Sequence, residues 1–254
     1  MYKQYTAPDK GVLHAGGGVE GWATAWSQGG FSSERQVRKL ASQPQWREMK
    51  RFVRPGWKVL EAGCGLGSWV RFLQSKEMEA TGLDFESKTL GRLRKAHPEL
   101  DLVGGDVRRL PFHDSTFDAL VSWGVIEHLE EGPNAALKEF FRVVRPGGYM
   151  FITVPWLNRR KLLSGMEDGG SNFDSVMSEF HQYHLTLSEL SEAIHLSGFK
   201  VLHQKPSSIH FKSLLPDWFR SANPILTKIL DRSLTPFFPS KVIASMQIAT
   251  CIKP

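Results

Sequence analysis

The chain has 254 residues, of which 41% are apolar and 23% are charged. This length and apolar content are enough for one sizeable domain with a full core. The formal net charge is +6, and the two cysteines exclude a disulfide-framed fold and stand in no spacing typical of a metal site.

No apolar run approaches the roughly 20 residues that a membrane-spanning helix needs. The first five residues, M-Y-K-Q-Y, lack the apolar segment of a signal peptide. We therefore expect a soluble, cytoplasmic protein.

Glycines and aromatic residues are interleaved near the start of the chain, from Gly16 to Phe31. Such mixing is typical of a lid over a site and also of a loosely ordered terminus. Residues 33–52 then have a helical pattern that is interrupted near Pro44. We interpret residues 1–52 as an N-terminal helical and flexible cap, followed by the main domain over residues 53–254.

A glycine-rich turn follows the first strong strand signal. Residues 57–62 form a short, largely apolar run that is typical of a buried parallel strand. Gly63, Gly65 and Gly67 have no Cβ, so the backbone there can take positive φ angles and approach a ligand closely. A helix is expected from about Leu66. By itself, this pattern also fits a tight connection in any doubly wound sheet.

Two carboxylates follow the next two predicted strands. The strand over residues 79–83 ends at Asp84, which is 21 residues after Gly63 and can accept both hydrogen bonds of a ribose diol. The strand over residues 100–103 is followed by Asp106. Its carboxylate can accept from an adenine amino group while the backbone N–H of Val107 faces a ring nitrogen.

Helical and strand patterns continue to alternate after these motifs. Helices are predicted over residues 87–95 and 133–143, and strands over residues 119–122 and 149–154. This alternation predicts an α/β fold with a mainly parallel sheet.

The chain resembles a class I S-adenosylmethionine-dependent methyltransferase, of the group that includes quinone and sterol biosynthesis enzymes. The matching stretches are E-A-G-C-G-L-G, G-L-D-F, G-D-V with L-P-F, S-T-F-D-A-L-V-S, V-I-E-H-L and R-P-G-G, in that order over residues 57–154. A later stretch, F-H-Q-Y-H-L, extends the resemblance to about residue 205.

The resemblance implies a doubly wound, mostly parallel seven-stranded sheet, a Rossmann-like methyltransferase fold. Its last two strands would be antiparallel, over residues 199–205 and 242–253. Residues 207–240 would then form an insertion before the last strand. The main domain over residues 53–254 would be the methyltransferase domain.

The resemblance also implies a binding site for S-adenosyl-L-methionine and no metal. Phe85 would lie beside the adenine, and Ser122 and Trp123 would line the path to the sulfonium. The other implied contacts are Glu61, Gly63, Gly65 and Gly67 with the methionine part, Asp84 with the ribose, and Asp106 with Val107 at the adenine edge. Phe85 and Val107 are also compatible with core positions. Glu127 and His128 are interpreted as capping or bracing a short helix.

Methyl transfer by in-line displacement needs an aligned acceptor and the exclusion of water, and it needs a base only if the acceptor must lose a proton. His14, His181 and His184 are candidates because a neutral imidazole can take a hydroxyl proton. We favour His181, with a surface or core histidine as the alternative. The preferred acceptor is a small molecule with an oxygen, nitrogen or carbon nucleophile, including a lipid or sugar intermediate.

Three alternative functions share some of these sequence features. A dehydrogenase is disfavoured because the glycines fall as G-x-G-x-G, where the dinucleotide fingerprint has G-x-G-x-x-G. An RNA or protein acceptor stays open, although the turn at residues 122–125 lacks the N/D-P-P-Y/F pattern of enzymes that methylate base amines, and no basic RNA module flanks the domain. A non-catalytic module that only binds the cofactor is the third alternative.

The excess positive charge lies in the last fifth of the chain. Residues 200–254 contain eight lysines and arginines against Asp217 and Asp231. Two helical apolar stripes occur there, and the second comprises Ile225, Leu226, Ile229, Leu230 and Leu234. We expect these stripes to pack onto the domain as a roof over its site. The alternatives are a basic amphipathic contact of residues 207–240 with a membrane surface or greasy substrate, and a dimer interface, so the oligomeric state stays open.

Overall fold

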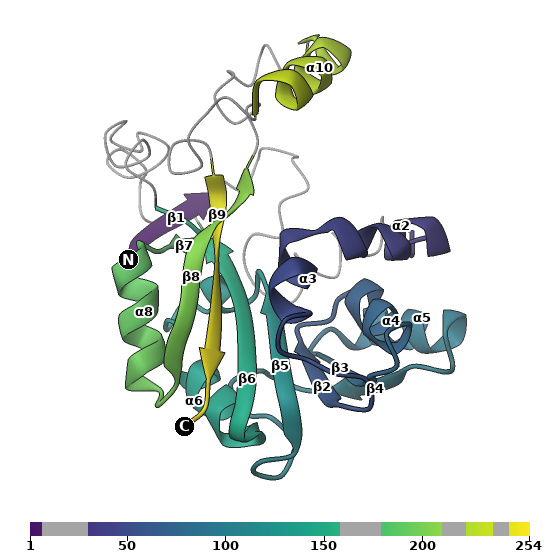
Figure 1. Ribbon diagram of the computed structural model, residues 1–254, viewed down its shortest axis with the longest axis vertical. Coiled ribbons are helices and arrows are strands. Elements are labelled where there is room, and N and C mark those ends of the chain that lie inside the picture. Colours follow the sequence, from purple (N-terminus) through teal and green to yellow (C-terminus); the bar gives the residue numbers. More distant parts are fainter. Residues whose placement is uncertain (7–29, 158–178, 210–221, 236–243) are drawn as a thin grey trace.

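A computed structural model of the protein describes residues 1–6, 30–157, 179–209, 222–235 and 244–254. Its main feature is a seven-stranded sheet with the order β4-β3-β2-β5-β6-β9-β8 (Figure 1). The strands are β2 (Lys58–Ala62), β3 (Glu79–Asp84), β4 (Asp101–Gly104), β5 (Phe117–Trp123), β6 (Val144–Pro155), β8 (Lys200–Ile209) and β9 (Ala244–Ile252).

Strand β9 is antiparallel to both of its neighbours, β6 and β8, and the other pairings in this sheet are parallel. The predicted α/β class, the seven-stranded sheet and the antiparallel final pair are therefore confirmed. One boundary differs, because β8 continues through Ile209 and the insertion starts after that residue. The longer strand follows from its continuous pairing with β9 as far as Ala244.

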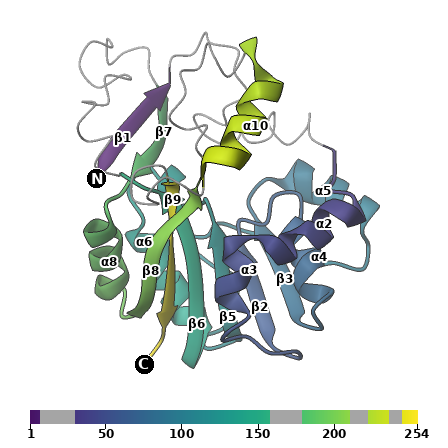
Figure 2. The ribbon, with the colours of Figure 1, turned by 45° about the horizontal axis from the view of Figure 1, so that its top comes forward.

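Helices cover both faces of the sheet (Figure 2). They are α2 (Glu34–Lys39), α3 (Pro44–Met49), α4 (Ser68–Gln74), α5 (Ser87–Ala96), α6 (Asn134–Val143), α8 (Leu187–Leu196) and α10 (Pro224–Leu234), with short 3-10 helices η1 (Leu40–Ser42) and η2 (Ile126–His128). None of the helices that the structure describes is long and apolar enough to cross a membrane.

The core has two parts because successive strand residues point to opposite faces. Val59 of β2 packs with apolar residues of α3, α4 and α5, whereas the next residue, Leu60, packs with residues of α6 and α8. Both side chains are fully buried. A sheet buried on both faces explains why these strands read as nearly continuous apolar runs.

Residues 33–52 are largely helical, as predicted, with the interruption at the expected place. Ser33 caps α2 through a capping box with Gln36, and α3 begins at Pro44, where proline is favoured at the first helical position. A second sheet was not predicted: β1 (Tyr2–Thr6) pairs antiparallel with β7 (Glu179–His184). The two strands are about 180 residues apart in sequence, and local patterns do not report such pairings.

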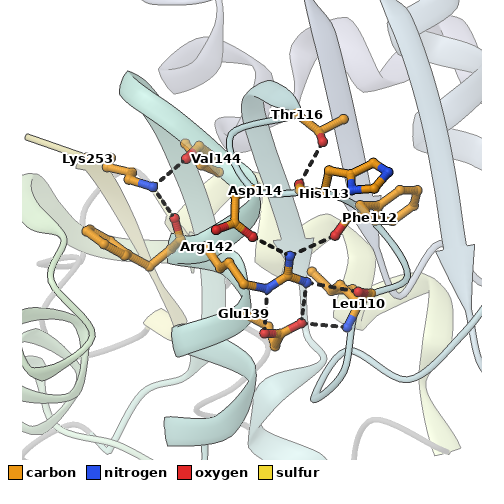
Figure 3. Close-up of polar contacts among 10 residues, drawn as sticks. Leu110, Phe112, His113, Asp114, Thr116, Glu139, Arg142, Val144 and Lys253 are labelled. Atoms are coloured by element: carbon orange, nitrogen blue, oxygen red, sulfur yellow. Dashed lines mark hydrogen bonds and ion pairs between the residues drawn. The ribbon is translucent and has the colours of Figure 1, made fainter.

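An arginine on α6 fixes the loop between β4 and β5 (Figure 3). The Arg142 guanidinium pairs with Glu139 and Asp114 and donates to the backbone carbonyls of Leu110 and Phe112, at 2.7–2.9 Å. Glu139 also accepts from the Leu110 N–H at 2.8 Å. These carboxylates raise the pKa of Arg142. The L-P-F segment of the sequence is thereby held directly after the Asp106 turn.

Candidate functional site

The glycine turn joins β2 to α4 at the carboxyl end of the parallel strands. Gly63, Gly65 and Gly67 have φ angles of +87°, +48° and +69°, as their sequence pattern predicted. A Cβ on Gly63 would lie 2.4 Å from a methyl carbon of Val125, which is closer than two carbon atoms can approach. Because Gly67 takes a left-handed conformation, α4 begins at Ser68, two residues later than expected.

Asp84 lies beside this turn at the end of β3. Its two carboxylate oxygens accept from the backbone N–H groups of Gly65 at 2.8 Å and Glu86 at 3.0 Å. Burial raises the pKa of Asp84, and these two hydrogen bonds act against that rise. A carboxylate can accept about four hydrogen bonds, so the Asp84 oxygens retain capacity for a further donor, such as a ribose hydroxyl.

Glu61 is a buried acid on β2, directly before the turn. Its side chain is only 4% exposed, and one carboxylate oxygen, Oε2, has no hydrogen-bond partner in the described part of the chain. Burial raises the pKa of Glu61 well above its usual range, and the negative charge of Asp84 adds to the rise. Such burial favours the protonated carboxyl group, and a cation beside it would favour the ionised form.

Two further polar atoms at the end of the adjacent strand, β5, are buried and have no partner within the described ranges. They are the Ser122 hydroxyl and the Trp123 indole N–H. Strands β2 and β5 are direct neighbours, with Glu61 opposite Val121. The centre of the Trp123 ring lies 5.3 Å from the centre of the Trp69 ring on α4, so the two indoles pack against each other.

These groups fit the cofactor that the sequence implies. S-Adenosylmethionine has an ammonium for a buried carboxylate such as Glu61 and a ribose diol for Asp84, and the glycine turn lets the backbone approach a ligand closely. Unpartnered buried polar atoms are rare in folded proteins and mark places where a ligand or water completes the hydrogen bonding. The assignments of Glu61, Asp84, Ser122 and Trp123 remain predictions that this geometry supports.

The residues expected around the adenine differ in their surroundings. Phe85 is 45% exposed and is therefore not a core residue, whereas Val107 is buried in the apolar core. Asp106 forms an ion pair with Arg108, whose side chain contacts both carboxylate oxygens at 2.7–3.0 Å. This ion pair lowers the pKa of Asp106. An adenine amino group would have to share that carboxylate with Arg108.

Glu127 is a buried acid in η2, shortly after the end of β5. The short helix is present, and its N-cap residue, Val125, makes no side-chain cap hydrogen bond. Glu127 is 2% exposed and its Oε2 has no partner in the described residues. Burial raises its pKa to about 8. The buried side chain is compatible with the bracing role, and the structural interpretation of Glu127 stays a prediction.

Two of the candidate histidines, His181 and His184, belong to β7. His181 belongs to that strand, but its side chain lies outside the described residues, as does the whole of His14. His184 is 5% exposed, and its ring meets the ring of Tyr2 edge-on, with 6.4 Å between the two ring centres. The Tyr183 hydroxyl donates to the Glu130 carbonyl at 2.6 Å, which ties β7 to the segment after η2. The base assignment to His181 stays a prediction.

Sequence reasoning missed the residues that join the start of α2 to the site. Ser32 contacts the hydroxyl of Ser68 at 2.8 Å, and its carbonyl accepts from Arg71 at 2.5 Å. Arg71 also forms an ion pair with Glu34. These contacts hold the chain before α2 against the first turn of α4. No motif in the sequence indicated this contact.

Comparison with known proteins agrees with this geometry. Residues 60–152 match the methyltransferase domain family. A protein of Mycolicibacterium smegmatis named as a probable S-adenosylmethionine-dependent methyltransferase is 31% identical over 178 residues, which are 67% of this chain and 65% of that protein. The demethylmenaquinone methyltransferase of Beutenbergia cavernae is 35% identical over 41% of this chain and 45% of its own length.

A third relative, the fatty-acid O-methyltransferase of M. smegmatis, is 39% identical over 39% of this chain and 37% of its own length. The chain thus spans less than two thirds of each of these relatives. Among solved structures, an S-adenosylmethionine-dependent methyltransferase from Mesorhizobium loti has the same fold, with a TM-score of 0.54. It is 17% identical, over 84% of this chain and 99% of that chain.

The matched motifs, the strand order and the glycine turn agree on one family. The chain contains a class I S-adenosylmethionine-dependent methyltransferase domain.

Proposed function

We propose that the protein transfers a methyl group from S-adenosylmethionine to a small-molecule acceptor with an apolar part. The observation that carries this proposal is a group of buried polar atoms, on Glu61, Ser122 and Trp123, that have no partner among the residues that the structure describes. Leaving such an atom buried and unpaired costs roughly 1–3 kcal/mol, and a bound cofactor that supplies partners would offset this cost.

In this proposal Glu61 receives the ammonium of the methionine part and Asp84 holds the ribose hydroxyls. Ser122 and Trp123 lie at the end of β5, toward the reacting end of the cofactor. When bound, the cofactor supplies a methyl group on a positively charged sulfur, which needs no further activation. The task of the surrounding residues is then to orient the acceptor and exclude water.

An acceptor that must lose a proton also needs a base. His181 remains our candidate, because the strand that contains it joins the region of η2 through the bond between Tyr183 and Glu130. A neutral imidazole can accept a hydroxyl proton near pH 7. An acceptor that is already ionised, such as a carboxylate, needs no base.

The preference for an acceptor with an apolar part has two supports. Two of the relatives are named for demethylmenaquinone and for fatty acids. The chain also exposes large aliphatic side chains on α10, beyond the same end of the sheet as the glycine turn (Figure 1). The alternative acceptors are a sugar intermediate, an RNA and a protein, and the same assay can test each of them.

The test is transfer of a labelled methyl group. The full chain is incubated with S-adenosylmethionine labelled on the methyl group and with separate acceptors: a long-chain fatty acid, a prenylated quinol, a sugar, RNA and a basic protein. We expect label in the organic phase with one apolar acceptor and a matching amount of S-adenosylhomocysteine. Glu61→Gln should abolish transfer, and Glu192→Gln, an exposed position on α8, should not.

Transfer to RNA or protein alone would contradict the small-molecule proposal. Cofactor binding without transfer to any acceptor class would favour a non-catalytic module.

A further inference from the structure

Helix α10 has an exposed apolar face. Ile225 is 77% exposed, Leu226 45% and Ile229 56%. The expected packing of this stripe onto the domain is therefore wrong for these three residues, while Leu230 and Leu234 are half-buried. Three large aliphatic side chains side by side on one short helix are unusual for a surface that faces only water.

Positive charge flanks the same face. At 3.6 residues per turn, Arg232 lies about 20° and Lys228 about 60° around the helix axis from Ile225. Both cations are exposed. Asp231, the acid of α10, lies on the opposite side, near the buried Thr227, and is half-buried. The exposed face of α10 therefore combines aliphatic residues with cations and carries no acid.

The position of the helix is also informative. Figures 1 and 2 both show α10 beyond the end of the sheet at which β8 ends and β9 begins. Because β8 runs parallel to β2 and β5, this is the end that carries the glycine turn. A surface that docks on α10 would thus face the same end of the molecule as the cofactor site.

We propose that this face of α10 docks on the surface of an anionic lipid bilayer. The aliphatic side chains would enter the boundary between headgroups and acyl chains, while Lys228 and Arg232 extend to the lipid phosphates. Charge complementarity decides in favour of this partner: the cations border the apolar stripe, as in interfacial helices.

This surface goes beyond the proposed methyl transfer and can be tested without cofactor. The full chain is sedimented with vesicles of phosphatidylcholine alone and of phosphatidylcholine mixed with phosphatidylglycerol. We expect binding to the anionic vesicles, weakened by salt. The double variant Ile225→Ser with Ile229→Ser should bind about tenfold or more weakly, because two exposed side chains lose their burial in lipid.

Charge is tested with a matched pair of double variants. Lys228→Glu with Arg232→Glu should lose the preference for anionic vesicles. Lys39→Glu with Lys95→Glu changes the net charge equally at exposed positions on α2 and α5 and should bind as the wild type does. All changed positions are exposed, so we expect each variant to fold. Urea denaturation should give each variant an unfolding free energy close to that of the wild type.

Equal loss in both charge variants would overturn the proposal, as would equal binding to neutral vesicles. If the wild type forms a dimer without vesicles and the Ile225→Ser, Ile229→Ser double variant is a monomer, a second copy of the chain occupies this face. That result would also overturn the proposal.

Discussion

The buried carboxyl group of Glu127 gives a quantitative prediction of how stability depends on pH. Its pKa is about 8 in the folded protein, compared with 4.5 for an ordinary glutamate, and the side chain is 2% exposed. Below pH 4.5 the group is protonated in the folded and the unfolded chain, so it does not affect stability. As the pH rises, the unfolded chain loses this proton first and the free energy of unfolding falls.

The magnitude follows from the width of this window. The two pKa values differ by about 3.5 pH units, and each unit corresponds to about 1.4 kcal/mol. The wild type should therefore lose about 4–5 kcal/mol through Glu127 between pH 4.5 and pH 8, with no further loss above pH 8. Glu127→Gln has nearly the same shape and carries no titrating group, so it avoids this loss.

The assay is urea denaturation of the wild type and Glu127→Gln at several pH values from 5 to 9. The variant's gain in unfolding free energy should rise by about 1.4 kcal/mol per pH unit up to about pH 8 and then stay constant. Glu192→Gln, at an exposed position of α8, is the control and should show no such slope. A difference that is independent of pH, or that falls as the pH rises, would refute the reasoning, because it would mean that Glu127 is stabilised as an ion.

Three further predictions concern the glycine turn, the Arg142 cluster and the thiols. Gly63→Ala should lower the unfolding free energy by about 3 kcal/mol, since it combines a strained φ angle with a clash against Val125. Gly56→Ala, with a φ of +80° and open space around the Cβ position, should cost only about 1 kcal/mol in the same urea titration. Arg142→Met should lower the unfolding free energy by about 2–4 kcal/mol in thermal or urea unfolding, because two carbonyls and two carboxylates lose their donor. Arg38→Met, at an exposed position of α2, is the control, and an equal loss in both variants would contradict a stabilising role for Arg142. Burial raises the pKa of the Cys64 and Cys251 thiols, so Ellman's reagent should react with both only after denaturant is added, and rapid labelling of the native chain would show that one is accessible.

The sequence predicted those parts of the fold that depend on local chemistry. The apolar runs of the central strands, the glycines at residues 63–67 and the acid at the end of β3 each report a local requirement, namely burial, positive φ or a carboxylate at a strand end. Strand β1 has no such local signature. Its pairing with β7 joins residues about 180 positions apart, and only the folded chain shows it.

The candidate site was predictable in position but not in its bonding. The sequence placed Glu61, Ser122 and Trp123 near one another, but burial and the lack of a partner depend on the whole surrounding structure. Asp106 illustrates the opposite case, since its carboxylate pairs with Arg108 only two residues away. For α10, the periodicity predicted an apolar stripe, yet a stripe alone does not tell which neighbour, if any, covers it.

The central claim is that Glu61 receives the positively charged end of S-adenosylmethionine. Burial keeps the pKa of Glu61 raised in the free protein, so a cation that binds beside it should release a proton to the buffer. Isothermal titration calorimetry in two buffers of different ionisation enthalpy measures both the affinity and this proton release.

For the wild type we predict binding in the micromolar range with proton release that the two buffers reveal. Glu61→Gln should bind at least about tenfold more weakly and release fewer protons, while its stability is unchanged or higher, because a buried acid has been removed. Equal affinity and equal proton release in the wild type and Glu61→Gln would contradict the account and would place the cofactor's ammonium elsewhere.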